Sequence, residues 1–384
     1  MNVALVTHNV IKGDGQGRVN YELARHLLQC GASVDLYADQ VADELLDEGA
    51  TWHPIHPEFE EIILLKVWRF KRIANRHLAE SHDQYDIILG CGVTLDIPHT
   101  HNAAHFVHGP WLDSPYHAAR VESGLRSWYQ WLFTALNARW ERSTFARADE
   151  VIAVSEMVRD ELIEIGIPRD AVHVINNGVD LDEFSPGQAA RPPLGLPEDV
   201  VLGLFVGDLE SPIKNLDGVL HALADIPGVH LAVAGSVGQS PYPSLAHSLG
   251  IGSRVHFLDY RRDITDLMRA ADFFTLPSRR DSCPLVLLEA MASGLPTITA
   301  TTVGNSNLVS DDSGFVLNGP DDQQLLKHAL RVLRDHPDRR HAMGQAARAT
   351  AEQHGWRHMT EQYRSVFEAY LRRRSTSSEL STTA

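Results

Sequence analysis

The sequence predicts an α/β protein built from two doubly wound parallel sheets, one in each half of the chain. Short apolar runs alternate with helix-period patterns through the first half, and the second half restarts the same rhythm. A strand followed by a helix, repeated several times, is typical of a parallel sheet with helices on both faces. A segment rich in proline and glycine, residues 185–197, separates the two halves and suits an interdomain linker.

The expected strands follow from these apolar runs. In the first half they are residues 3–7, 33–37, 86–89, 104–108, 150–154 and 172–175. In the second half they are residues 200–206, 230–234, 254–258, 273–276, 297–299 and 315–317. The run at 3–7 has no basic leader and is too short for a signal peptide, so we interpret it as a buried strand. No run of eighteen apolar residues occurs, so no spanning helix is expected.

The domain boundaries follow from the linker and from the end of the chain. We expect an N-terminal domain at 1–185, a linker at 186–199 and a C-terminal domain at 200–354. Large apolar residues at helical spacing, from Trp356 to Tyr370, predict a helix at 355–373. The Ser/Thr-rich tail at 374–384 is expected to be disordered.

Composition narrows the class of protein. With 384 residues, 43% apolar and 22% charged, the chain is typical of a soluble protein with two ordinary domains. A formal net charge of −16 argues against nucleic acid as the main partner. Cys30, Cys91 and Cys283 form neither a disulfide framework nor a CxxC metal motif, so we expect a reducing cytoplasm.

The most informative segment is residues 277–294, which places Asp281 and Glu289 eight positions apart across an expected loop-to-helix junction. Unpaired amides at a helix start favour a phosphate, here at residues 282–285. The two acids are then available to accept hydrogen bonds from sugar hydroxyls. The pattern indicates a nucleotide sugar, although acids near helix starts also serve simply as caps.

This segment resembles the acid-x7-acid motif of family-4 retaining glycosyltransferases, which usually carries Glu at both ends. The resemblance implies the GT-B fold, in which two Rossmann-like domains face each other across a cleft, with the C-terminal helix crossing back to the N-terminal domain. It also implies that Glu289 binds the ribose and that Asp281 lies near the transferred sugar. The donor-binding residues expected in this segment are Asp281, Ser282, Cys283, Pro284, Leu285 and Glu289.

A glycine-rich turn follows the first expected strand, at residues 13–18. Its spacing is not the dinucleotide fingerprint GxGxxG, so a nicotinamide site is weakly indicated. It looks like the GG-x-G-R loop of the glycosyltransferases, with Asp14 replacing the first glycine. The resemblance places Gly15 against the donor phosphate or the acceptor, and Gly17 and Arg18 on the acceptor side. A plain turn is the alternative.

Four histidines fall within ten residues: His99, His101, His105 and His108. A metal site is one interpretation, but neither an HExxH pattern nor a cysteine set accompanies them. We favour a strand at 104–108 whose last residue, His108, matches the family's strand-terminal His near the reacting carbon of the donor sugar. The alternative is a histidine satisfied within the core.

The second half opens with a segment that resembles the family's G-R-L…K-G element, where Arg and Lys neutralise the donor pyrophosphate. Lys214 matches, but Asp208 stands where the family has Arg. Either Asp208 points away and Lys214, Arg279 or Arg280 supplies the positive charge, or catalysis is weakened. Residues 255–264 resemble the loop whose backbone reads the nucleotide base, which adds Arg262 to the donor-binding residues.

Residues 66–76 carry five cations, no acid and two large aromatic residues. This pattern suits a peripheral helix on an anionic membrane, which would place the protein at the inner face of the membrane. An ordinary amphipathic helix packed on the sheet is the alternative interpretation.

Taken together, the resemblance implies a retaining glycosyltransferase that moves a hexosyl unit from a nucleoside diphosphate sugar to a hydroxyl acceptor on a glycan, a lipid-linked molecule or a small molecule. His108, Asp281 and Lys214 are the implied catalytic residues, and His108 is also implied to bind the acceptor. Neither a metal nor another cofactor is expected. A nucleotide-sugar epimerase or hydrolase on the same fold, or a non-catalytic donor-binding scaffold, stays open as an alternative. The sequence does not identify the donor sugar, the nucleotide base or the acceptor.

Overall fold

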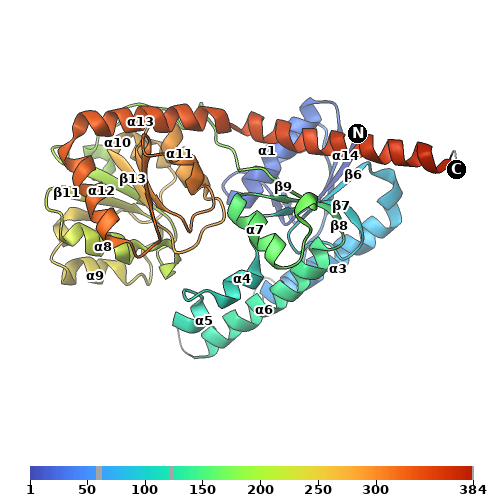
Figure 1. Ribbon diagram of the computed structural model, residues 1–384, viewed down its shortest axis with the longest axis horizontal. Helices are drawn as coiled ribbons and strands as arrows, with labels where there is room; N and C mark the ends of the chain where they lie inside the picture. Colours follow the sequence, from blue (N-terminus) through green and yellow to red (C-terminus); the bar gives the residue numbers. More distant parts are fainter. Residues whose placement is uncertain (58–62, 122–123, 383–384) are drawn as a thin grey trace. The chain divides into compact units, whose positions relative to one another are not determined.

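The computed structural model describes residues 1–57, 63–121 and 124–382, and the chain divides into two compact units (Figure 1). The first unit comprises Met1–Asn177 and Trp356–Ala384, and the second comprises Gly178–Gly355. Each unit is built on its own parallel sheet, as the alternating strand and helix patterns predict.

The first unit contains a seven-stranded sheet in the order β5-β3-β1-β6-β7-β8-β9, with every pair parallel. The short strands β2 and β4 pair with each other as a separate, two-stranded parallel sheet. The strands are β1 (Asn2–Val6), β2 (Asn9–Val10), β3 (Ser33–Ala38), β4 (Gln40–Val41), β5 (Thr51–Pro54), β6 (Ile87–Cys91), β7 (His99–Ala104), β8 (Ala148–Ala153) and β9 (Val172–Val174). The α-helices are α1 (Gly15–Gln29), α2 (Asp43–Asp47), α3 (Ile63–Ser81), α4 (His108–Asp113), α5 (Ala118–Val121), α6 (Leu125–Phe145), α7 (Glu156–Glu164) and α14 (Trp356–Thr382).

The second unit contains a six-stranded parallel sheet in the order β12-β11-β10-β13-β14-β15. Its strands are β10 (Val201–Val206), β11 (Val229–Ala234), β12 (Val255–Phe257), β13 (Phe273–Leu276), β14 (Thr297–Ala300) and β15 (Gly314–Leu317). Its α-helices are α8 (Leu216–Ala224), α9 (Tyr242–Ser248), α10 (Ile264–Ala270), α11 (Leu285–Ala292), α12 (Gln323–Asp335) and α13 (Pro337–Ala351). Its core is one cluster of buried apolar side chains that includes Phe205, Phe273 and Phe274.

Both sheets reverse their strand order at one point. The chain builds outward from β1 through β3 to β5, and then continues with β6 on the other side of β1. In the second unit it runs from β10 to β12, and then continues with β13 on the other side of β10. Ligands of open parallel sheets bind outside the carboxyl ends of the strands at such a switch point.

The strand predicted at 104–108 is wrong. The strand of this region is β7 (His99–Ala104), and His108 is the first residue of α4. The polar segment His99–Asn102 is buried because its side chains find partners within the sheet. Thr100, for example, accepts a hydrogen bond from the amide of Ile88 and donates one to its carbonyl. The apolar pattern therefore misplaced the strand.

The boundaries between the units also differ from those expected. The first unit ends at Asn177, and residues 186–199 belong to the second unit instead of forming a free linker. Arg191 in this segment pairs with Asp272 at 2.9 Å and donates to the carbonyl of Val200. Helix α14 continues to Thr382, through most of the tail expected to be disordered, and Ser375 and Thr376 donate to the carbonyl of Arg372 one turn earlier.

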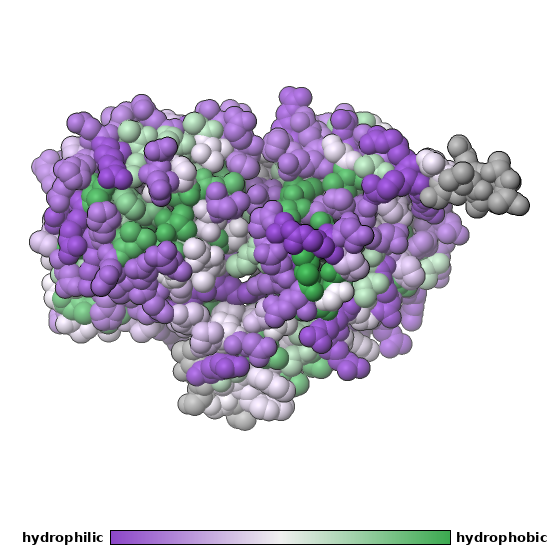
Figure 2. All heavy atoms as spheres, viewed as in Figure 1, coloured by the Kyte–Doolittle hydropathy of each residue, from purple (hydrophilic) through white to green (hydrophobic). Residues whose placement is uncertain are grey.

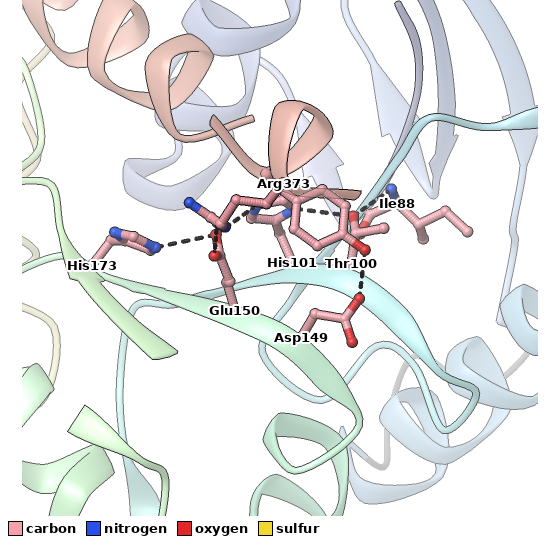
Figure 3. A network of polar contacts seen from close by, with 8 residues as sticks. Ile88, Thr100, His101, Asp149, Glu150, His173 and Arg373 are labelled. Atoms are coloured by element: carbon pink, nitrogen blue, oxygen red, sulfur yellow. Dashed lines mark hydrogen bonds and ion pairs between the residues drawn. The ribbon is translucent and has the colours of Figure 1, made fainter. Parts of the chain in front are cut away.

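Helix α14 joins the sheet of the first unit through a polar network (Figure 3). Arg373 of α14 pairs with Glu150 of β8. Glu150 Oε2 also lies 3.1 Å from His173 Nε2 and 3.2 Å from His101 Nε2. Tyr370 donates to Asp149 at 2.5 Å. Burial alone would raise the pKa of the Glu150 carboxyl. The combined effect of His101, His173 and Arg373 is larger and opposite, so this pKa is lowered. The network therefore ties the last helix to β8 and β9.

Several histidines of the first unit are buried in the neutral form. Burial lowers the pKa values of His8, His99 and His105 to about 4. The geometry around His99 agrees, because Nδ1 lies 2.8 Å from the carbonyl of Ile97 and Nε2 lies 3.1 Å from the amide nitrogen of Asn102. Nδ1 donates and Nε2 accepts, so the ring needs no second proton.

Because these histidines are buried in the neutral form, we predict that acid lowers the stability of the first unit. Each is neutral in the folded state but takes up a proton below about pH 6.5 when unfolded, so stability is full above pH 6.5 and falls until about pH 4. Between pH 7.5 and pH 5, His99 alone should account for a loss of about 2 kcal/mol. Replacing His99 by Gln should remove that share of the pH dependence.

Tryptophan fluorescence during urea unfolding measures this effect on the first unit alone, because all seven tryptophans lie there: Trp52, Trp68, Trp111, Trp128, Trp131, Trp140 and Trp356. The control is His77→Gln, which removes an exposed histidine of α3. An unchanged pH dependence in H99Q would contradict the prediction.

Candidate functional site

The switch point of the second sheet holds an ion pair between Lys214 and Asp281. Lys214 ends the 3₁₀ turn Pro212–Lys214, which follows β10, and Asp281 lies in the loop that follows β13. Because β10 and β13 are neighbours in the sheet, their carboxyl ends bring these two loops together. Lys214 Nζ donates to Asp281 Oδ2, and both side chains are mostly buried, with exposed fractions of 26% and 15%.

Close packing at the ends of β10 and β11 shapes this site. The aliphatic stem of Lys214 lies beside Gly207, where an added Cβ would come within 3.3 Å of Lys214 Cγ. Gly235, at the end of β11, approaches even more closely, since a Cβ there would lie 2.1 Å from the carbonyl oxygen of Gly207. Glycine at position 235 is therefore required by the approach of the Gly207 backbone, whereas at Gly207 the neighbour is the flexible stem of Lys214.

Buried asparagines hold the loop that carries Asp281. Asn215 donates to the carbonyls of Pro277 and Pro320, and Asn305 donates to the carbonyl of Pro284. Both asparagines have no exposed surface. Asp281 itself forms a backbone bridge with Val303. Sequence reasoning missed the two asparagines, since an isolated Asn gives no pattern that distinguishes a loop anchor from a turn residue.

Helix α11 begins directly after this loop, as the sequence predicted. Pro284 is its N-cap residue and provides no side-chain hydrogen bond to the first turn, which leaves the amides from Leu285 onward as potential anion donors. Ser282 and Cys283 are buried, and within the described part of the chain the Ser282 hydroxyl has no hydrogen-bond partner. Glu289 lies one turn further along α11 and is partly exposed.

The other charged residues of this region have defined roles. Asp208 is exposed, and its carboxylate accepts a hydrogen bond from the amide of Glu210 within its own loop. Arg279 makes a bidentate pair with Asp217 at 2.9 and 2.6 Å, so it is already neutralised. Arg262 is exposed on the loop after β12, at the same carboxyl edge of the sheet. Lys214 contacts Asp281 in the loop that leads into α11, which favours it over Arg262 and Arg279 as the cation for a phosphate.

In the first unit, the glycine-rich turn leads into α1. A Cβ on Gly15 would meet no atom within 4 Å, so its backbone is accessible to a ligand. Gly17 differs, because a Cβ there would lie 2.9 Å from Asp14 Oδ2 and 3.1 Å from the carbonyl oxygen of Ile11. Arg18 pairs with Glu22 at 2.7 Å, and its guanidinium lies 5.8 Å from the ring centroid of Trp356. Gly17 and Arg18 thus have structural contacts of their own.

His108 opens α4 and is held by Glu141 of α6. The amide nitrogen of His108 donates to Glu141 Oε2 at 2.7 Å, and Nδ1 lies 2.5 Å from Oε1. Glu141 is only 2% exposed, and sequence reasoning missed it because it lies 33 residues downstream in a helix of mixed polarity.

The four clustered histidines do not converge on one point. His99 and His101 lie on β7, His105 follows that strand, and His108 begins α4. Among residues 1–57, 63–121 and 124–382, no group of three or more His, Cys, Asp or Glu side chains is arranged to hold a metal ion.

Helix α3 packs through Phe70, Ala74 and Leu78, which are buried at helical spacing. Among the cations noted in the sequence, Lys66 pairs with Asp39 and Lys71 with Asp96. The exposed part of α3 presents Ile63, Leu65 and Trp68. No helix in the described part of the chain is both long and apolar enough to span a bilayer. Figure 2 accordingly shows a largely hydrophilic face with separate hydrophobic patches.

Two family models match consecutive parts of the sequence. The model described as Glycosyltransferase Family 4 matches residues 13–183, and the model described as Glycosyl transferases group 1 matches residues 188–350.

Curated relatives include the D-inositol 3-phosphate glycosyltransferases of Mycolicibacterium smegmatis and Mycobacterium avium. The first is 34% identical over 238 residues, covering 59% of this chain and 54% of that protein. The second is 36% identical over 233 residues, covering 58% of this chain and 55% of that protein. The matched region thus spans about half the length of these relatives.

Solved structures share the fold at low sequence identity. WaaG, a glycosyltransferase involved in lipopolysaccharide biosynthesis, superposes with a TM-score of 0.75 at 22% identity, over 95% of this chain and 99% of that one. Anabaena HepE in complex with UDP-glucose superposes with a TM-score of 0.70 at 20% identity, over 96% of this chain and 100% of that one. These matches confirm the expected GT-B fold. The chain belongs to the group 1, family 4 glycosyltransferases.

Proposed function

We propose that this protein is a retaining glycosyltransferase that moves a hexosyl unit from a nucleoside diphosphate sugar to a hydroxyl acceptor. The observation that carries the proposal is the contact between Lys214 and Asp281 at the switch point between β10 and β13. An ammonium group has three N–H donors, so Lys214 can keep its bond to Asp281 while it donates to a phosphate oxygen. The amides at the start of α11 supply further donors to the same diphosphate.

The remaining site residues fit this assignment. Ser282 contributes a buried hydroxyl that lacks a partner within the described residues, which suits a ligand oxygen. Glu289 on α11 is assigned to the ribose hydroxyls, and Asp281 to a sugar hydroxyl as well as to Lys214. On the first unit, Gly15 and His108 are assigned to the donor phosphate and to the transferred sugar, with Gly17 and Arg18 beside the acceptor.

In the proposed reaction, the bond between the anomeric carbon and the phosphate oxygen breaks, and a bond to the acceptor oxygen forms on the same face. The departing phosphate oxygen takes the proton of the acceptor hydroxyl, so no separate base is consumed. Lys214 and the α11 amides stabilise the charge that develops on the diphosphate. UDP-glucose, the ligand of HepE, is the first donor to test, with D-inositol 3-phosphate among the acceptors because of the curated relatives.

We also propose that the exposed aromatic side chains of α3 and α6 bind the surface of an anionic membrane, which suits a lipid-linked acceptor. Trp68, Trp128 and Trp131 are 44%, 62% and 47% exposed. Trp68 lies beside the Arg72 guanidinium, at 5.5 Å, and lines one hollow together with Arg139 and Arg142 of α6. Aromatic rings flanked by arginine favour the interface of a bilayer that carries negative charge.

Separate roles for the two acids predict separate kinetic effects. Glu289→Ala should weaken nucleotide binding about 10- to 100-fold, since it removes hydrogen bonds to a charged group. Asp281→Ala should lower kcat about 100-fold, with a smaller change in donor Kd, because it releases Lys214 from its position. The control is Asp225→Asn, which removes an exposed acid of the same unit.

Donor titrations and initial rates with UDP-, GDP- and ADP-sugars measure these effects, and the anomeric configuration of the product tests retention. Products formed without any acceptor would instead indicate an epimerase or a hydrolase. Wild-type behaviour of both E289A and D281A would contradict the proposed site.

We predict that transfer needs no divalent metal, since Lys214 and main-chain amides provide the donors for the diphosphate. Adding excess EDTA should change the transfer rate by less than about twofold, a factor that corresponds to under half a kcal/mol in the barrier. Initial rates before and after dialysis against EDTA measure this. Loss of activity that Mg²⁺ or Mn²⁺ restores would show that the prediction is wrong.

The membrane proposal predicts selective binding to anionic vesicles. The wild-type protein should cosediment with vesicles containing phosphatidylglycerol and much less with pure phosphatidylcholine, and salt should weaken the binding. The double variant Trp68→Ala, Trp131→Ala should lose most of it. Tyr260→Ala, which removes an exposed aromatic residue of the second unit, serves as the control. Equal binding to neutral and anionic vesicles would contradict the proposal.

A further inference from the structure

Glu141 contacts His108 through both of its carboxylate oxygens. Its Oε2 accepts the main-chain amide of His108 at 2.7 Å, and its Oε1 lies 2.5 Å from Nδ1 of the same residue. The glutamate is almost completely buried, whereas the histidine side chain keeps 21% of its surface exposed. A buried carboxylate requires compensating donors, and His108 supplies one to each oxygen of Glu141.

The two contacts determine where the imidazole carries its proton. A carboxylate only accepts hydrogen bonds, so Nδ1 of His108 must be the protonated nitrogen. In the neutral ring Nε2 then has a lone pair and can accept a hydrogen bond. This is the tautomer logic of a histidine oriented by a carboxylate on its other nitrogen.

Aromatic side chains fix the plane of the same ring. Phe106 and Phe133 contact His108 edge to face, with centroid distances of 4.9 and 5.9 Å. Phe133 lies on α6, as Glu141 does, two helical turns earlier. Helix α6 therefore positions both the His108 ring and its Nδ1 proton. Glu141 of α6 also accepts the hydrogen bond of the first main-chain amide of α4, that of His108.

We propose that Glu141 is a positioning residue that presents Nε2 of His108 as a hydrogen-bond acceptor for a hydroxyl of the transferred sugar. The inference rests on the proposed transfer reaction. The other tautomer would place an N–H at the same position, and a hydroxyl could then only accept.

The first test needs no substrate. In the full chain with ¹⁵N-labelled histidine, the neutral form of His108 should show a protonated Nδ1 and a pyridine-type Nε2, assigned by comparison with His108→Ala. Glu141→Gln should change this pattern, because its amide group cannot accept from both donors. A protonated Nε2 in the neutral ring of the wild-type protein would overturn the inference.

The second test measures transfer. Glu141→Gln should lower kcat about 10- to 100-fold, as is usual for a residue that orients a functional histidine, while the KM for the donor changes little. In the His108→Ala background, Glu141→Gln should have almost no further effect, because both act through one ring. Glu161→Gln, which alters another buried helix glutamate of the same unit, should leave kcat unchanged.

The two tests separate the possible failures. Additive effects of His108→Ala and Glu141→Gln on kcat would overturn the positioning role, as would a lower melting temperature that accounts for the whole loss. If the wild-type protein transfers no sugar from any donor, the proposed function fails, and the ring-nitrogen spectra still decide whether Glu141 orients His108.

Discussion

The candidate site depends on the reversal of strand order in a parallel sheet. Between β10 and β13 the chain changes direction across the sheet, so the loops after these two strands meet at one edge. Lys214 comes from one loop and Asp281 from the other, which explains why residues 67 positions apart in the sequence form an ion pair. The same reversal places α11 with its first turn beside the pair, where main-chain amides add to the single lysine charge.

Much of this arrangement could be predicted from the sequence because it depends on local patterns. Apolar runs gave β10 and β13 within one or two residues, and proline followed by an apolar stretch gave the start of α11. Lys214 was expected at the donor diphosphate and Asp281 near the transferred sugar. Asp208 stands where the family has Arg, and its carboxylate accepts a hydrogen bond from the amide of Glu210. The sequence alone does not reveal this contact within the loop.

The parts that escaped prediction depend on contacts between distant residues. The strand β7 looks polar, and its burial is explained by hydrogen bonds of Thr100 to Ile88 on β6 and of His99 to Asn102 and Ile97. Glu141 becomes visible as a partner of His108 only once α4 and α6 are packed together. The segment around Arg191 has the composition of a linker, yet its pairing with Asp272 attaches it to the second unit.

The pairing of Lys214 with Asp281 has a consequence for how a donor is selected. Lys214 is matched by Asp281 and Arg279 by Asp217, so these two cations add little net positive charge to the site. The long-range attraction of these two cations for an anion is then weak. Recognition must come from short-range hydrogen bonds that only a correctly shaped donor can make, so affinity should vary little with ionic strength.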